Sequence, residues 1–90
     1  MVVTMIKELH VEIISPEGYL FDGLCHLAIV PSVSGEIGVM SDHESFLAKL
    51  QEGKIAIFDD NQNILKEFYI KNGFANMFNN KLLVLIEDGV

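Results

Sequence analysis

The sequence contains no arginine, and this absence is the first guide to what the chain does not bind. Its six basic residues are all lysines, against thirteen aspartates and glutamates, so the formal net charge at pH 7 is −7. Nucleic-acid phosphates need clustered cations, and bases are most often read by arginine side chains. Anionic lipid headgroups need basic patches as well. The composition therefore argues against nucleic acid and lipid headgroups, and it suits basic protein surfaces.

Cysteine and long apolar runs are also scarce. Cys25 is the single cysteine, which excludes an internal disulfide and any metal site built from several cysteines. Residues 1–10 lack the basic start, apolar stretch and small-residue cleavage site of a signal peptide. The longest purely aliphatic run late in the chain, Leu82 to Ile86, has five residues, whereas a spanning helix needs about 20. A reducing cytoplasmic setting, or the surface of a membrane assembly, is the compatible location.

Short apolar segments alternate with turn residues along the chain, which is typical of an antiparallel β sandwich or barrel. Apolar and polar residues alternate over residues 9–13, as in a half-buried strand. The asparagines at 79–80 predict a tight type I′ hairpin, because asparagine tolerates the positive φ of such turns, and the polar residues 59–63 predict a longer hairpin loop. Residues 42–50 alone have helical content, and they fit a strand equally well. We predict an all-β fold of short strands with little or no helix.

Motifs that would carry catalysis or bind a cofactor are missing. The chain has no phosphate-binding glycine loop and no serine-hydrolase motif. Residues 59–63 are rich in oxygen ligands but lack the glycine and closing glutamate of an EF-hand. The histidines His10, His26 and His43 show no metal-ligand spacing, and Cys25 lies on the apolar side of its predicted strand, where a thiol acts as a small hydrophobe. We predict no catalytic, cofactor-binding or metal-binding residue.

The segment from Pro31 to His43 is the strongest positive signal. Gly35 and Gly38 allow a tight reversal with positive φ, and we expect Glu36 between them to project from the loop into solvent. Two interpretations are open from the residues alone. The loop either presents one carboxylate to a partner or is an ordinary loop whose glycines serve only the turn. Exposed acidic loop residues are common, which favours the ordinary loop.

Several short motifs follow one another in a defined order. They are Ser15-Pro16-Glu17-Gly18 with Phe21 and Gly23, Val30-Pro31, Ser34 to Val39, His43, Phe46-Leu47, Leu50, Gly53 and the closing stretch Leu83 to Asp88. In order and spacing they resemble the N-terminal domain of the ATP synthase epsilon chain, from about Leu9 to the C-terminus. The sequence departs from the family pattern at Ser32, where the family has glycine, at Ser34, where it often has glutamate, and in lacking a proline soon after His43.

The resemblance implies a flattened β sandwich in the central stalk of a rotary ATP synthase. It implies a non-catalytic rotor subunit of a proton-translocating F-type enzyme, without a cofactor, that couples c-ring rotation to the catalytic head. In the family, one sheet face packs on the gamma subunit and one edge rests on the c-ring. Carried over by position, Glu36 contacts the c-ring, and Ser15 and His43 lie near the gamma subunit. The implied location is peripheral, on the cytoplasmic face of the bacterial inner (plasma) membrane.

Further expectations follow from this resemblance and from the excess of apolar residues. The whole of residues 1–90 is expected to form one β-sandwich domain, with apolar residues such as Ile14, Met40, Phe74 and Phe78 left over for a partner interface. The family's C-terminal helices are not in this sequence, either because the gene product is short or because this is one domain of a longer protein. We accordingly expect no inhibitory arm and no ATP site. The competing interpretation is a free-standing β-sandwich module that binds a ligand or a protein.

Overall fold

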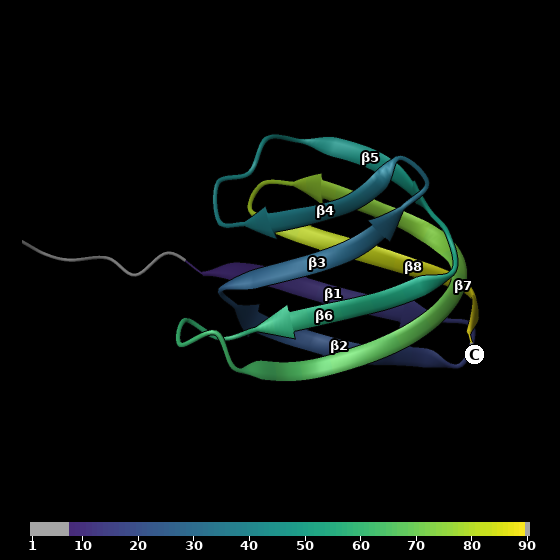
Figure 1. The fold of residues 1–90 in the computed structure, drawn as a ribbon, viewed down its shortest axis with the longest axis horizontal. Coiled ribbons are helices and arrows are strands. Elements are labelled where there is room, and N and C mark those ends of the chain that lie inside the picture. The colour runs from purple at the N-terminus through teal and green to yellow at the C-terminus, as the bar shows by residue number, and fades with distance from the viewer. Residues whose placement is uncertain (1–7, 90) are drawn as a thin grey trace, which may run out of the picture.

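Eight strands make up the regular structure of residues 8–89, the part of the chain that this computed structural model describes (Figure 1). No helix occurs within that range, which confirms the predicted all-β architecture. The strands are β1 (Leu9–Ser15), β2 (Gly18–Cys25), β3 (Leu27–Ser32), β4 (Gly35–Met40), β5 (Phe46–Leu50), β6 (Gly53–Phe58), β7 (Ile64–Phe78) and β8 (Lys81–Gly89).

All eight strands belong to one hydrogen-bonded sheet that folds over itself. The strand order is β2-β1-β8-β7-β5-β3-β4, and β6 pairs with both β3 and β7. Strands β3, β5, β7 and β6 therefore form a closed circuit of pairings. All pairs are antiparallel except β1 with β8, which is parallel. In Figure 1 the layer containing β3, β4 and β6 overlies the layer containing β1 and β8, as in a sandwich.

Strand β7 is long because it serves both layers. Residues 64–70 pair with β6, and residues 73–77 pair with β5 while β8 lies on the other side. The β7–β8 register shifts on either side of Asn72, where the strand changes partners. Gly73 follows at once, and a Cβ placed there would overlap the carbonyl oxygen of Leu85. A strand bend of this kind commonly needs glycine, because only glycine allows the neighbouring backbone so close.

The core lies between the two layers and follows the period of two expected of half-buried strands. Leu9, Val11 and Ile13 of β1 are fully buried, while the intervening side chains are partly exposed. The predicted alternation over residues 9–13 is therefore confirmed. The largest fully buried side chains are Leu9, Val11, Ile13, Val30, Val39, Leu50, Ile55, Ile57, Ile70, Met77, Leu82 and Val84.

Two predicted connections between strands are present. Asn79 and Asn80 join β7 to β8 with φ angles of 51° and 60°, the left-handed conformation that a type I′ hairpin requires. The loop between β6 and β7 is held by the carboxylate of Asp59, whose Oδ1 accepts hydrogen bonds from the backbone N–H groups of Asn61 and Asn63, both at 2.9 Å. These bonds, chiefly the one from Asn63, lower the pKa of Asp59.

The segment around the two glycines differs from its sequence-based description. Residues 33–34 make the turn, and pairing resumes at once between Ser32 and Gly35. Gly35 has a φ of 124°, whereas Gly38 lies inside β4 without a positive φ. Glu36 is consequently a strand residue opposite Pro31 and not part of a loop, although it is exposed as expected. The ladder extends to the turn because the turn needs only two residues. Residues 46–50, left open between helix and strand, form β5.

Candidate functional site

The three side chains expected to contact partners do not converge on one site. Ser15 ends β1 at the turn into β2, and Glu36 is the second residue of β4. His43 lies in the connection between β4 and β5. In Figure 1 the end of β1 and the β3–β4 turn lie at one end of the sandwich, whereas the β4–β5 connection lies at the other.

Hydrogen bonds fix the β4–β5 connection beside the start of β1. The backbone N–H of Asp42 donates to Oδ1 of Asn80 at 3.1 Å, and the N–H of His10 donates to the carbonyl oxygen of Asn80 at 3.2 Å. The seven residues of β1 separate this end from Ser15. At about 3.3 Å per residue, Ser15 and His43 lie roughly 20 Å apart along the strand direction. A partner that touches both must therefore span roughly 20 Å of this surface.

Ser15 organises its own turn. Its hydroxyl accepts a hydrogen bond from the backbone N–H of Glu17 at 3.3 Å and lies 3.2 Å from the carbonyl oxygen of Gly18. Such local serine bonds stabilise turns. The side chain is only partly exposed, so its first role is to hold the β1–β2 connection in shape.

Glu36 stands on the outer face of the layer that contains β3, β4 and β6. Lys54 on β6 forms a 2.9 Å ion pair with Glu67 on β7. The pKa of Lys54 is raised, first by the hydrogen bond to Glu67 and in smaller part by the charge of Glu36. Lys54 therefore interacts with two carboxylates, but it forms its ion pair with Glu67 and not with Glu36. The Glu36 carboxylate is available to a basic or hydrogen-bonding partner at the end of the sandwich where the β3–β4 turn lies.

His43 is held in a defined orientation. Its Nδ1 lies 2.8 Å from the carbonyl oxygen of Glu44, and its ring meets the ring of Phe46 edge-on with centroids 5.2 Å apart and an interplanar angle of 74°. Because a carbonyl oxygen only accepts hydrogen bonds, Nδ1 carries a proton in this geometry. The other ring nitrogen, Nε2, does not contact this carbonyl oxygen.

Four exposed apolar side chains lie on the outer face of β5, β7 and β8. We define the apolar patch as Leu47, Phe74, Phe78 and Leu85, which are 74%, 39%, 61% and 44% exposed. Phe74 stands opposite Leu85. Leu47 stands opposite Asn76, which lies midway between Phe74 and Phe78 on β7. Polar side chains lie among them, since Lys49 stands opposite Phe74 and Lys81 stands opposite Phe78. Isolated apolar residues are ordinary on a surface, but several gathered on one sheet face among polar ones are typical of an interaction site.

The other expected interface residues have different positions. Met40 is exposed at the end of β4, on the other layer, whereas Ile14 is partly buried beside Leu85 in the parallel ladder. The prediction of leftover apolar surface is confirmed for Phe74, Phe78 and Met40. Leu47, the most exposed member of the patch, was missed by sequence reasoning. The unresolved choice between helix and strand for residues 42–50 hid the face on which it lies.

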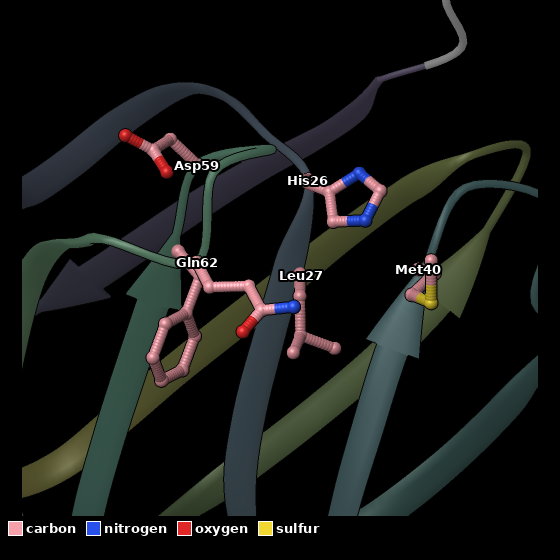
Figure 2. Close-up of a pocket in the computed structure, with 6 residues that line it drawn as sticks. His26, Leu27, Met40, Asp59 and Gln62 are labelled. Carbon is pink, nitrogen blue, oxygen red and sulfur yellow. The ribbon is translucent and has the colours of Figure 1, made fainter.

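A cavity of about 300 Å³ opens beside Met40. Figure 2 shows His26, Leu27 and Met40 on one side and Asp59 and Gln62 of the β6–β7 loop on the other. Phe58 is its one aromatic hydrocarbon ring. The competing interpretation is a module that binds a ligand, and a sugar is one such ligand. Sugar-binding sites rely on aromatic faces for stacking, so a lining with a single such ring gives little support to sugar binding here.

Cys25 is structurally inert. It is 2% exposed in the core, and burial raises the pKa of its thiol to about 11. A thiol with so high a pKa is almost entirely protonated near neutral pH, and it is neither a good nucleophile nor a good metal ligand. This agrees with the sequence-based assignment of Cys25 to an apolar strand face.

The structure brings one histidine to two carboxylates, which the search for histidine spacing could not find. Nε2 of His10 lies 2.6 Å from Oδ1 of Asp22 and 3.8 Å from Oε1 of Glu12. His10 and Glu12 are two residues apart on one face of β1, and Asp22 stands directly opposite Glu12 on β2. Lys81 on β8 lies 2.6 Å from the same Glu12 oxygen. The sequence does contain a pattern that could have indicated this cluster: His10 and Glu12 are two residues apart in one strand, and Asp22 lies in the next strand of the same hairpin.

Comparison with protein families gives one match that extends over nearly the whole chain. Residues 8–90 match the family described as the ATP synthase, Delta/Epsilon chain, beta-sandwich domain. None of the described residues forms a helix long and apolar enough to cross a membrane.

Curated relatives carry the name ATP synthase epsilon chain. The chain is 31% identical over 86 residues to epsilon chain 1 of Methylococcus capsulatus, which covers 96% of this chain and 61% of that protein. It is 34% identical over 83 residues to the epsilon chain of Caulobacter vibrioides, covering 92% of this chain and 94% of that protein. The chain thus spans about three-fifths of the first relative and nearly all of the second.

Solved structures share the fold at lower sequence identity. A chain in the Euglena gracilis mitochondrial ATP synthase structure, described as OSCP/F1/c-ring, superposes with a TM-score of 0.84 at 14% identity, covering 98% of this chain and 56% of that one. A chain in the central stalk and c-ring of the Tetrahymena thermophila mitochondrial ATP synthase gives 0.72 at 16% identity, covering 94% and 67%. These likenesses establish the β-sandwich fold.

Proposed function

Since the chain belongs to the family of the ATP synthase delta/epsilon chain β-sandwich domain, we propose that it is a non-catalytic central-stalk subunit of a proton-translocating F-type ATP synthase. The observation that carries the proposal is the family match over residues 8–90. In this role the chain couples c-ring rotation to the catalytic head by binding the gamma subunit and the c-ring. Its place is peripheral, on the cytoplasmic face of the bacterial inner membrane.

The apolar patch is the proposed docking face for the gamma subunit. It lies on β5, β7 and β8, between the end where Ser15 sits and the end where His43 sits. The roughly 20 Å between those two residues corresponds to about 14 residues of α-helix at 1.5 Å per residue. An elongated helical partner laid along the patch would reach Ser15 and His43 together.

The turn end of the sandwich is the proposed contact with the c-ring. Glu36 is exposed there beside the two-residue β3–β4 turn, whose Val33 is 52% exposed. A carboxylate next to an apolar side chain suits a polar loop that carries a basic group, and the net charge of −7 favours approach to such loops. Contacts at an exposed edge guide register and association rate more than they add affinity.

A pair of substitutions on β7 tests the gamma-binding face. Phe78→Glu places a charge in the apolar patch, and Tyr69→Glu places the same charge at a similarly exposed aromatic position on the outer face of the other layer. We expect Phe78→Glu to weaken binding to purified gamma subunit at least about 30-fold, because it replaces a large aromatic contact with a carboxylate that must lose its water at the interface. Tyr69→Glu should bind as the unchanged chain does. Equal binding by all three proteins would refute the assignment of this face.

A charge reversal tests the proposed c-ring contact. In membranes reconstituted with the full enzyme, Glu36→Lys should reduce the coupling of ATP hydrolysis to proton pumping. Asp60→Lys, at the opposite end of the molecule, makes the same charge change and should leave coupling intact. Both residues are exposed, so neither variant should lose more than about 0.5 kcal/mol of folding stability. Unaltered proton pumping with Glu36→Lys would count against the contact.

A further inference from the structure

We propose that His10, Glu12 and Asp22 form a binding site for a divalent first-row metal ion, with zinc as the ion best matched to the ligands. One nitrogen and two carboxylate oxygens, one from each residue, all lie within 4.8 Å of one another. Imidazole with carboxylate is a ligand set that zinc favours, and three protein ligands leave a fourth position for water. The cluster lies on the same sheet face as the apolar patch, in the cross-strand row that contains Lys81 and Phe78, but zinc binding by the isolated chain does not depend on the proposed role in the rotor.

The strand geometry brings these ligands together on one sheet face. Residues two apart on a strand share a face, so His10 and Glu12 both point outward from β1. Asp22 is the cross-strand partner of Glu12 in the antiparallel β1–β2 pair. Zinc bonds of about 2.0–2.2 Å in a tetrahedral site put ligand atoms about 3.3–3.6 Å apart. The 2.6 Å and 3.8 Å separations from His10 Nε2 bracket that range. The 2.6 Å contact is a hydrogen bond in which Nε2 donates to Asp22, so zinc would replace this proton, which is released to solvent, as the two side chains rotate apart.

The charges also favour a cation. Glu12 and Asp22 are like charges placed directly opposite each other, an arrangement that destabilises a sheet unless a positive group lies between them. In this structure Lys81 pairs with Glu12 from β8, on the side of β1 away from Asp22, with its Nζ 2.6 Å from Oε1 of Glu12. The Lys81 side chain is 43% exposed, whereas that of Glu12 is only 12% exposed. A metal ion would therefore compete with Lys81 for an anchored carboxylate.

Binding would link an edge strand to its neighbour. Within the described residues β2 pairs with β1 alone, at the end of the strand order. Asp22 belongs to β2, and the other two ligands belong to β1. A bound ion would therefore tie β2 to the sheet, and backbone amides of β2 should exchange more slowly with solvent when zinc is present.

Calorimetric titration of the 90-residue chain with zinc chloride tests the proposal, with cobalt(II) as a spectroscopic probe of tetrahedral geometry. One zinc per chain should bind. His10→Gln should weaken binding at least about tenfold, since even loss of an outer-shell partner costs 10–100-fold. Lys81→Gln should tighten it about two- to fivefold, the strength of an exposed ion pair. His43→Gln, a histidine change outside the cluster, should have no effect.

Asp22→Asn gives a second ligand variant in case His10→Gln does not fold, because Asp22 is an exposed side chain whose loss spares the core. It should also weaken zinc binding at least about tenfold. The proposal is overturned if neither the unchanged chain nor Lys81→Gln binds zinc. It is equally overturned if binding persists unchanged in the ligand variants, or if magnesium gives the same stoichiometric signal, which would indicate an unspecific acidic surface.

Discussion

Replacing Gly73 by alanine should destabilise the sandwich more than any comparable change at an exposed glycine. Gly73 lies where β7 passes from one layer to the other, and its backbone touches β8. An added Cβ would overlap the carbonyl oxygen of Leu85 and would lie 3.2 Å from Cα of Ile86. Both neighbours are backbone atoms in a hydrogen-bonded strand, so relief requires the two strands to separate by about 1 Å.

The cost follows from that displacement. Overpacking with a backbone shift costs about 1–3 kcal/mol, and each strand hydrogen bond that lengthens adds about 1 kcal/mol. We expect Gly73→Ala to lose about 3 kcal/mol, which for a domain of this size lowers Tm by about 12–24 °C. Urea unfolding followed by circular dichroism measures it. Gly38→Ala is the matched control, because its Cβ would meet only a leucine methyl at 3.6 Å. If Gly73→Ala loses no more stability than this control, the argument from close approach is wrong.

Three further predictions concern the thiol, the hairpin and the acid limit of stability. Cys25, buried and with a pKa near 11, should not react with a thiol reagent at pH 8 until guanidinium unfolds the chain. Asn80→Ala should cost about 2 kcal/mol in urea unfolding, because it loses bonds to Glu8 and Asp42 and strains a residue with φ of 60°, whereas Asn80→Gly should cost less. The pKa of Asp59 is lowered in the folded chain, so its carboxylate stabilises the fold at pH values above the ordinary pKa of 3.8. This stabilisation is lost as the pH falls through the lower folded-state pKa. In unfolding titrations, Asp59→Asn should therefore lose less stability on acidification than the unchanged chain.

Local chemistry in the sequence was enough to predict most of the fold. Asparagine pairs and alternating apolar residues act over a few positions, so the 79–80 hairpin and the buried face of β1 could be predicted correctly. The segment around Gly38 could not, because its conformation depends on pairing with β3, not on the glycine itself. The passage of β7 between layers at Gly73 depends likewise on distant residues in β8.

The candidate site was less accessible from sequence for the same reason. Ser15, Glu36 and His43 come from a family resemblance, and their separation at two ends of the molecule appears only once β1 and the β4–β5 connection are placed. The association of His10 with Asp22 spans twelve positions and depends on the register of the β1–β2 hairpin. A slip of one residue in that register would turn every side chain of one strand to the other face.

The closed circuit of β3, β5, β7 and β6 would distribute force within the sheet if the chain carries load, as the proposed rotor role requires. Force applied at the β3–β4 turn can pass from β3 to β7 by two parallel routes, through β5 and through β6. The route through β5 joins β3 at one register pair, Ser32 with Leu50, which is flanked by backbone hydrogen bonds from Val33 to Lys49 and from Gln51 to Pro31, both at 2.9 Å. The route through β6 joins β3 at three register pairs. Because the two routes are separate, rupture of either one would leave β3 and β7 still connected through the other.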